Sequence, residues 1–215
     1  MTDITDPASS SARDAVLARI RASLVDRPAA VAIPRAYETA MPTSVDLVAR
    51  FVDRVDDYRA TIERATIERL PAAIAAIFAA HGARRVATPG GVPESWFAAT
   101  DAERVPDDPP LSHAALDALD GTITGCAVAI AETGTIVLDA GPDQGRRVLS
   151  LLPDLHVCIV RVEQVVGTVP EALARLDPGR PQTWISGPSA TSDIELQRVE
   201  GVHGPRRLAV ILVDG

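Results

Sequence analysis

Apolar residues in the first third of the chain recur at the spacing of amphipathic helices. The stripes run from Val16 to Leu24, from Leu47 to Val55 and from Ile67 to Phe78, and each places its apolar positions on one helical face. Three prolines between residues 28 and 42 predict an extended connector between the first two helices. The first third is therefore predicted to be mostly helical.

The periodicity changes near residue 84. Downstream, apolar and β-branched runs bounded by Gly, Pro and Asp predict strands at residues 85–87, 121–131, 135–138, 155–162, 183–186 and 208–213. Helical segments are predicted between them at residues 112–119, 144–152 and 169–176. This alternation predicts an α/β fold with a largely parallel central sheet flanked by helices. The tight turn at residues 132–134 predicts a hairpin, which would make the sheet mixed.

The change in periodicity also suggests how the chain is divided. We expect residues 1–10 to be a disordered tail and residues 11–83 to be an N-terminal helical segment packed on the domain. Residues 84–215 are expected to form the α/β domain itself.

Composition restricts the classes of partner. Among 215 residues there are 29 acidic and 21 basic side chains, which gives a formal charge of -8. An acidic chain with 3% aromatic residues lacks the basic face and the stacking platforms of nucleic-acid-binding proteins, so no nucleic-acid partner is expected. Every basic residue is Arg, which excludes a Schiff-base Lys and the Lys of a phosphate-binding loop.

Membrane and metal chemistry are not expected in this chain. The longest charge-free stretch, residues 70–83, is too short to span a bilayer, and the acidic start of the chain is unlike a signal peptide. We therefore expect a cytoplasmic protein. Cys126 and Cys158 sit in apolar runs without the paired spacing of zinc or iron–sulfur ligands. Buried thiols, with no metal and no cofactor in this chain, are the expectation.

The first candidate site is the turn Glu132-Thr133-Gly134 between two apolar strands. Partial burial there would raise the pKa of Glu132 and suit it to act as a nucleophile or base, with Thr133 and Gly134 as ligand-binding residues beside it. Alternatively, the turn is purely structural, with the carboxylate accepting turn amides and Gly134 supplying a positive φ.

The second candidate is the loop from Ser186 to Glu195, which follows a predicted strand. Its hydroxyls, Ser189 and Thr191 among them, and its amides could bind a neutral or singly charged ligand together with Asp193 and Glu195. Alternatively, Ser192 and Glu195 form a capping box that only begins a helix.

The third candidate is His203, which lies in a glycine-bounded segment before the last strand. It would serve as an acid/base group or as a contact for a binding partner, or have no functional role. Arg146 and Arg147 could bind a carboxylate in a bidentate manner. Alternatively, they are exposed helical side chains without a binding role.

The three motifs together resemble one protein family. AETGT at residues 131–135, GPSATSDIE at 187–195 and GVHGPRRL at 201–208 occur in the order found in the lactate-utilisation protein C (LUD domain) family. The resemblance implies a CoA-transferase-like α/β fold. It also implies a cluster-free subunit that acts with Cys-rich iron–sulfur proteins, which carry the clusters, to oxidise L-lactate to pyruvate.

On this resemblance we expect a component of a lactate-oxidising system rather than a self-sufficient enzyme, with a small carboxylate as a further possible ligand. One alternative is an independent acyl- or CoA-transferase-like or isomerase-like enzyme that uses Glu132, by analogy with the Glu nucleophile of CoA transferases. Another is a non-catalytic ligand-binding or assembly protein.

Overall fold

The computed structural model describes residues 7–26, 31–191, 199–200 and 203–214. The chain divides into two units, Met1–Tyr37 and Glu38–Gly215. The described part of the first unit contains helix α1 (Pro7–Ser23), followed by residues 31–37 without helix or strand. The second unit contains the sheets.

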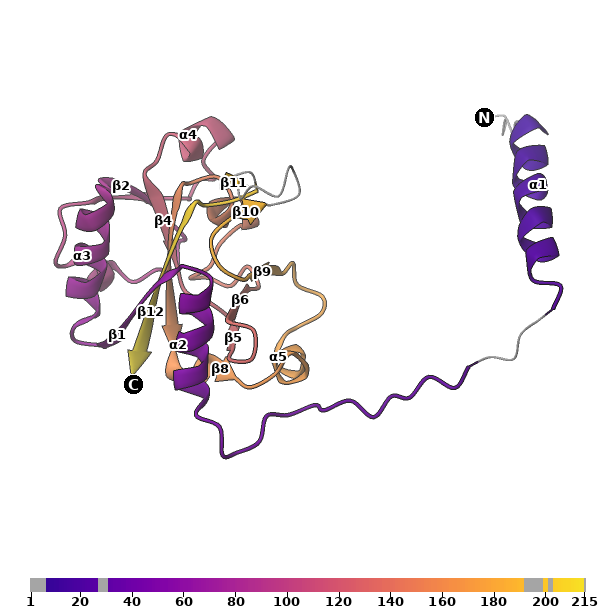
Figure 1. Ribbon diagram of the computed structural model, residues 1–215. Coiled ribbons are helices and arrows are strands. Elements are labelled where there is room, and N and C mark those ends of the chain that lie inside the picture. Colours follow the sequence, from indigo (N-terminus) through magenta and orange to yellow (C-terminus); the bar gives the residue numbers. More distant parts are fainter. Residues whose placement is uncertain (1–6, 27–30, 192–198, 201–202, 215) are drawn as a thin grey trace. The chain divides into compact units, whose positions relative to one another are not determined.

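A parallel sheet forms the centre of the second unit (Figure 1). Its strands within the described residues are β1 (Thr61–Thr66), β2 (Arg85–Thr88), β3 (Glu103–Pro106), β4 (Gly121–Thr124), β7 (Leu155–Arg161) and β12 (Arg207–Asp214). They are ordered β1-β12-β7-β4-β2-β3, and every neighbouring pair is parallel. The predicted α/β class and the parallel sheet are confirmed.

The hairpin predicted at residues 132–134 is present, but it lies outside the central sheet. A second sheet in the described part of the unit has the order β8-β5-β6-β9. Its strands are β5 (Val128–Ile130), β6 (Thr135–Leu138), β8 (Val165–Val166) and β9 (Thr183–Ile185). β5 and β6 are antiparallel, so the antiparallel pairing belongs to this sheet and the central sheet stays parallel. Beyond it, β10 (Ala190–Thr191) pairs with β11 (Val199–Glu200).

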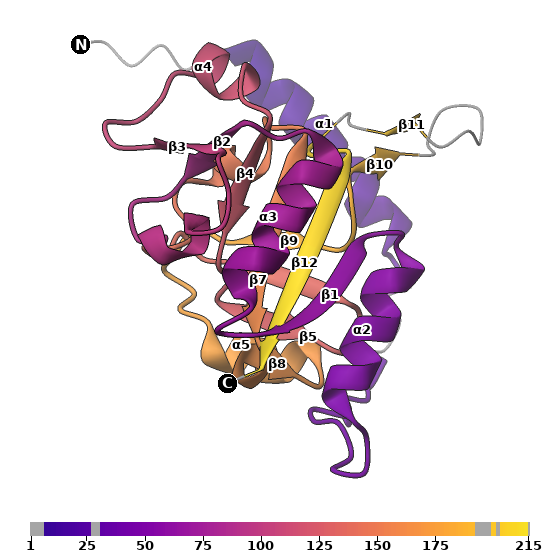
Figure 2. The ribbon, with the colours of Figure 1, turned by 90° about the vertical axis from the view of Figure 1, so that its left-hand side faces the viewer.

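Helices cover both faces of the central sheet. The α-helices of this unit are α2 (Leu47–Asp57), α3 (Leu70–His81), α4 (His113–Asp117) and α5 (Val169–Arg175), and the 3-10 turns are η1 (Glu94–Phe97), η2 (Arg147–Ser150) and η3 (Val162–Gln164). On one face, α3 and η1 pack on the central strands through Ile74, Phe78 and Trp96 (Figure 2). On the other face, Phe51 and Val55 of α2 share a core with the second sheet. The outer face of the second sheet packs against α5.

Strand β1 was not predicted, and it changes how the first third of the domain is organised. Residues 61–66 pair with β12 as an edge strand of the central sheet. Four of its six side chains are exposed, so its sequence lacks the apolar run that marks a buried strand. Ile67, expected to face inward on a helix, is exposed, and α3 begins only at Leu70.

Helix boundaries follow local chemistry. The Asp46 side chain caps α2 by accepting a hydrogen bond from the Ala49 N–H at 3.0 Å. Gly82 ends α3 in the left-handed conformation with φ +66, which glycine adopts readily. The helix predicted at residues 144–152 is reduced to the single turn η2, because Gly145 adopts φ +67 at its start. No helix in the described ranges is long and apolar enough to cross a membrane.

Candidate functional site

Two of the three sequence motifs are joined by a chain of hydroxyl groups. β6 and β9 run antiparallel with Ile136 opposite Ile185, which places Thr135 beside Ser186. The Thr133 and Thr135 hydroxyl oxygens are hydrogen-bonded at 2.7 Å, and those of Thr135 and Ser186 at 2.8 Å. Thr135 is buried, so the middle of this chain is shielded from water. The turn containing Glu132 is thereby tied to the loop that follows β9.

Two glycines let helix α2 approach this junction closely. Gly134 has φ +61, and a Cβ there would lie 2.8 Å from the Arg54 Cβ. Gly187 has φ +81, and a Cβ there would lie 2.6 Å from the Tyr58 Cβ. Both positions need a conformation that L-residues avoid, and both need space that a side chain would occupy. The positive φ expected of Gly134 is therefore confirmed.

The third motif joins the same region through Ser189. The His203 N–H donates to the Ser189 Oγ at 3.1 Å, and the Ser189 N–H donates to the Pro205 carbonyl at 2.8 Å. These two bonds hold the segment before β12 against the loop after β9. The three motifs, which are separated by up to about seventy residues in sequence, form one continuous structure.

His203 stands between two hollows. One, of about 280 Å³, is lined by Trp184, Ser186, Ser189 and His203 among others. The other, of about 480 Å³, is lined by residues that include Asp117, Leu151, Asp154, His203 and Arg206. The Arg206 Nε donates to Asp154 at 2.5 Å, so a guanidinium and a carboxylate are fixed at this hollow. The hollow of about 280 Å³ therefore combines hydroxyls with an imidazole, which are groups that can hydrogen-bond a small carboxylate, whereas the guanidinium at the other hollow is already paired with Asp154.

The position of this site differs from expectation. Loops after parallel strands were expected to build it, because ligands of open α/β sheets gather at the carboxyl ends of the strands. Instead His203 and Arg206 precede β12, and Asp154 precedes β7, so these residues lie at the amino ends of the central strands. Ser186, which follows β9 of the second sheet, adds a hydroxyl group to the site at this edge.

The remaining candidate residues are placed less favourably. Glu132 is exposed rather than partly buried, and its backbone N–H donates to the Gly167 carbonyl at 3.0 Å. The expected desolvation of its carboxylate is therefore wrong. Thr191 lies on β10, where its backbone pairs with Val199. Asp193 and Glu195, like the predicted capping box, lie outside the described residues.

Sequence reasoning missed how the carboxyl edge of the central sheet is filled. The loop between β6 and η2 lies against it: the Gly91 N–H donates to the Pro142 carbonyl at 2.8 Å, and the Gly125 N–H to the Asp143 carbonyl at 2.9 Å. A Cβ on Gly125 would lie 2.1 Å from the Asp143 carboxylate. The crevice that commonly binds ligands in this fold class is thus occupied here by the protein's own loop.

Arg146 does bind a carboxylate, but an internal one. Its guanidinium donates to both Asp107 oxygens, at 2.6 and 2.7 Å. Burial by itself would raise the pKa of Asp107, but the hydrogen bonds from Arg146 and from the Leu111 N–H outweigh it and hold the pKa below its ordinary value. The pair fastens the loop after β3 to the loop before η2, so Arg146 is structural. Arg147 is exposed and donates to the Gln182 carbonyl at 3.4 Å.

A buried polar cluster lies inside the sheet. The His156 Nε2 and the Thr124 hydroxyl are 2.8 Å apart, and burial lowers the pKa of His156 to about 4. Cys126 and Cys158 are both buried, as predicted. A hydrogen bond with Cys158, burial and the nearby charges raise the pKa of Cys126 well above its ordinary value. The Cys126 thiol is therefore protonated, and both thiols are shielded by burial, which makes them poor candidates for nucleophiles.

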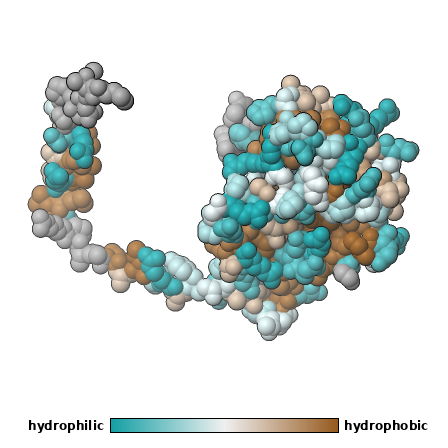
Figure 3. Space-filling model, turned by 180° about the vertical axis from the view of Figure 1, so that it is seen from behind, coloured by the Kyte–Doolittle hydropathy of each residue, from teal (hydrophilic) through white to brown (hydrophobic). Residues whose placement is uncertain are grey.

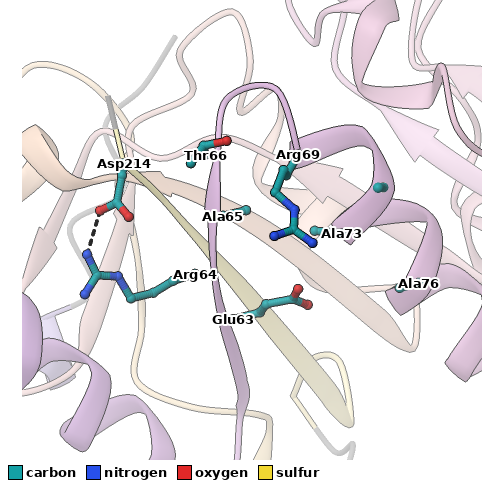
Figure 4. A pocket seen from close by; sticks show the side chains of 9 residues that line it. Glu63, Arg64, Ala65, Thr66, Arg69, Ala73, Ala76 and Asp214 are labelled. Atoms are coloured by element: carbon teal, nitrogen blue, oxygen red, sulfur yellow. Dashed lines mark hydrogen bonds and ion pairs between the residues drawn. The ribbon is translucent and has the colours of Figure 1, made fainter.

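A further hollow of about 350 Å³ opens where β1 and β12 end against the start of α3 (Figure 4). The Arg64 guanidinium and the Asp214 carboxylate form an ion pair at 2.7 Å on one side of it. Arg69 and Glu63 lie on the opposite side. In the part of the chain that the structure describes, no group of three or more His, Cys, Asp or Glu side chains is placed to hold a metal ion.

These features define a class of protein: an α/β domain with a parallel sheet, a small accessory sheet and a hydroxyl-lined site at their junction. The family model of the LUD domain matches residues 97–213. That match covers more than half of the chain, which therefore belongs to the LUD domain family.

Named relatives agree with this assignment. Lactate utilization protein C of Deinococcus radiodurans is 49% identical over 97% of this chain and 99% of its own length. Lactate utilization protein C of Bacillus subtilis is 39% identical over 43% of this chain and 41% of the relative. The solved structure of a DUF162 family protein from Deinococcus radiodurans has a TM-score of 0.66 and 48% identity, over 78% of this chain and 96% of that chain. The resemblance seen in the three motifs is confirmed.

Proposed function

We propose that this protein is a cluster-free subunit of a lactate-utilisation system that oxidises L-lactate to pyruvate. The observation that carries the proposal is the near full-length similarity to lactate utilization protein C of Deinococcus radiodurans, at 49% identity. The motifs AETGT, GPSA and GVHG also meet in one place, which supports a shared role for them.

The redox chemistry is assigned to partner proteins. Oxidation of a 2-hydroxy acid to a 2-oxo acid releases two electrons and two protons, and an electron acceptor has to take up the electrons. The sequence provides two cysteines, both buried, whereas a cluster held by thiolates alone needs four. Cys-rich iron–sulfur proteins are the partners that this proposal requires. The system is placed in the cytoplasm.

The contribution of this subunit is placed at the two hollows beside His203. A small carboxylate would bind in the hollow of about 280 Å³, where the Ser186 and Ser189 hydroxyls and the His203 imidazole can hydrogen-bond its oxygens. Glu132 is exposed, so the proposal does not depend on it as a nucleophile.

Deletion of the gene tests the proposal. Growth on L-lactate as the sole carbon source should be lost and should return with the wild-type gene, while growth on pyruvate stays normal. Equal growth of the deletion strain on L-lactate, in a strain without another lactate dehydrogenase, contradicts the proposal. Reconstitution with the proposed Cys-rich partners then tests directly whether lactate oxidation needs this chain.

A further inference from the structure

The hollow of about 280 Å³ beside His203 has an apolar side as well as a polar side. Its polar groups include the hydroxyls of Ser186 and Ser189 and the His203 imidazole. Two large apolar side chains that stay exposed also line it, Leu151 at 37% and Trp184 at 39%. Apolar surface on the face of the second unit seen in Figure 3 lies in patches between polar side chains, so exposure by itself marks no site. Apolar side chains that line a hollow together with hydrogen-bonding groups are typical of a small-molecule site.

Strand β9 brings Trp184 and Ser186 to the same side of the second sheet. Side chains alternate along a strand, and Ile185 between them packs into the core that this sheet shares with α2. Trp184 and Ser186 therefore lie side by side on the opposite face. The Trp184 Nε1–H donates to the Gln182 Oε1 at 3.1 Å, so the indole donor is satisfied and the rest of the ring offers apolar surface.

The polar side of the hollow is suited to a single negative charge. The Ser189 Oγ accepts the His203 N–H at 3.1 Å, so the hydroxyl proton of Ser189 is not used in this bond and can be donated to a ligand. No Asp, Glu or Arg is among the described residues that line this hollow. One carboxylate can therefore be hydrogen-bonded here without repulsion. A second carboxylate on the same ligand would lose water without gaining an ion-pair partner.

We propose that this hollow selects 2-hydroxy acids that carry one carboxylate and a short hydrocarbon substituent, and that Leu151 and Trp184 are the residues that determine this specificity. In L-lactate the substituent is the methyl group, and in the hollow it contacts these two side chains. The inference rests on the proposed function in taking the ligand to be a 2-hydroxy acid. It adds which of these acids bind and which side chains discriminate between them.

Isothermal titration calorimetry of the full-length chain with L-lactate, L-2-hydroxypentanoate and L-malate tests the proposal. L-2-Hydroxypentanoate has two more CH₂ groups than L-lactate and should bind about tenfold more tightly, because each buried CH₂ strengthens binding by up to about fourfold. L-Malate has a second carboxylate on the substituent and should bind at least about tenfold more weakly than L-lactate.

Variants assign the preference to particular side chains. Leu151→Ala and Trp184→Ala should each reduce the preference for L-2-hydroxypentanoate over L-lactate to about threefold or less. The matched control is Leu152→Ala, because Leu152 is 36% exposed but lines the hollow of about 480 Å³ and not this one. It should keep the wild-type preference. Ser186→Ala should weaken the binding of L-lactate and L-2-hydroxypentanoate by the same factor, because its hydroxyl contacts the part that both acids share.

Trp184 also reports where the acids bind. The chain has two Trp residues, and Trp96 is 5% exposed in the core, so a ligand in the hollow should change the fluorescence of Trp184 alone. Trp184→Phe keeps an aromatic side chain at the hollow. It should therefore keep the preference for L-2-hydroxypentanoate and lose the change in fluorescence.

Each other outcome overturns the proposal. Equal affinity for L-lactate and L-2-hydroxypentanoate, or for L-lactate and L-malate, would show that the hollow does not select by substituent. An equal loss of preference in Leu152→Ala would show an indirect effect, and binding without a change in fluorescence would place the acids elsewhere. Absence of binding of all three acids would show that the hollow takes another ligand or a side chain of a partner protein. Circular dichroism of each variant confirms that it stays folded.

The gene deletion distinguishes failure of this inference from failure of the proposed function. If the deletion strain does not grow on L-lactate but the calorimetric preference is absent, the inference is wrong and the role in lactate utilisation stands. If the deletion strain grows normally on L-lactate but the preference is present, the proposed function is wrong and the specificity of the hollow stands.

Discussion

The hydroxyls of Thr135 and Ser186 lie 2.8 Å apart although 51 residues separate them in sequence. This contact joins the turn after β5 to the loop after β9, and Ser189 extends the connection to His203. The three sequence motifs are therefore parts of one structure, whose stability and function can be tested separately.

Replacing the middle hydroxyl tests the stability of this junction. Thr135→Val keeps the shape of the buried side chain but leaves the Thr133 and Ser186 hydroxyls without this partner. We expect the free energy of unfolding to fall by about 1–2 kcal/mol, as for the loss of a buried hydrogen bond. Urea unfolding measures the change. Thr100→Val, which alters a half-buried loop hydroxyl away from the junction, is the comparison. Equal stability of Thr135→Val and wild type would show that water replaces the lost bonds.

His203 tests the candidate site itself. The side chain is exposed, so His203→Ala should leave the melting temperature within about 2 °C while growth on L-lactate is lost. His113→Ala is the matched control, because His113 is exposed on α4 and does not line the hollows beside His203. Normal growth of His203→Ala at normal protein abundance would remove His203 from the site.

Glu132 separates the two main functional interpretations. Because it is exposed, Glu132→Gln should not change stability. If the carboxylate takes part in binding or catalysis, growth on L-lactate falls. If growth on L-lactate is unchanged in Glu132→Gln but lost in His203→Ala, the function resides in the hollows and not in this turn. Protein abundance measured by immunoblot controls for expression.

Acidification should weaken the fold through His156. Burial lowers its pKa to about 4, below the ordinary value of 6.5, so the unfolded chain binds a proton more readily than the folded chain between these values. Stability contributed by the neutral imidazole is complete above about pH 6.5 and is lost as the pH falls toward 4, on the order of 3 kcal/mol in total.

Chemical unfolding of the wild type and of His156→Leu at several pH values checks this expectation. The variant has no imidazole to protonate, so the difference in unfolding free energy between the two proteins should change across this interval and level off above it. A constant difference between pH 4 and 6.5 would mean that the pKa of His156 is the same in the folded and the unfolded chain.

The pairing of Asp107 and Arg146 gives a second pH-dependent contribution. Because the pKa of Asp107 is held below its ordinary value, its stabilisation is present above about pH 4 and is lost as the pH falls through the lowered folded value. Asp107→Asn should cost about 2 kcal/mol at pH 7 and little once wild-type Asp107 is protonated. Arg146→Lys keeps the positive charge but not the bidentate geometry. Its stability at pH 7 should therefore lie between those of the wild type and of Asp107→Asn. Thermal melts of the three proteins at neutral and acidic pH measure this order.

The sequence by itself determined most elements that carry a strong local signal. The buried strands β7 and β12 were predicted from continuous apolar runs. Strand β1 was not predicted, because an edge strand with exposed charged side chains does not need an apolar period. The predicted helix at residues 144–152 failed because loop contacts decide its conformation, including the 2.6 Å bond from the Asp139 N–H to Gln144.

For the site, the sequence supplied the candidate residues and their family, but only tertiary structure decided which of them meet. Short motifs record residue types, whereas the contacts of Thr135 with Ser186 and of Ser189 with His203 depend on how the two sheets pack. In the folded protein Glu132 is exposed, and the site lies at the amino ends of the central strands. Arg146 pairs with Asp107 of the same chain and not with a ligand. Burial and proximity arise from segments distant in the chain, and for that reason a local pattern does not contain them.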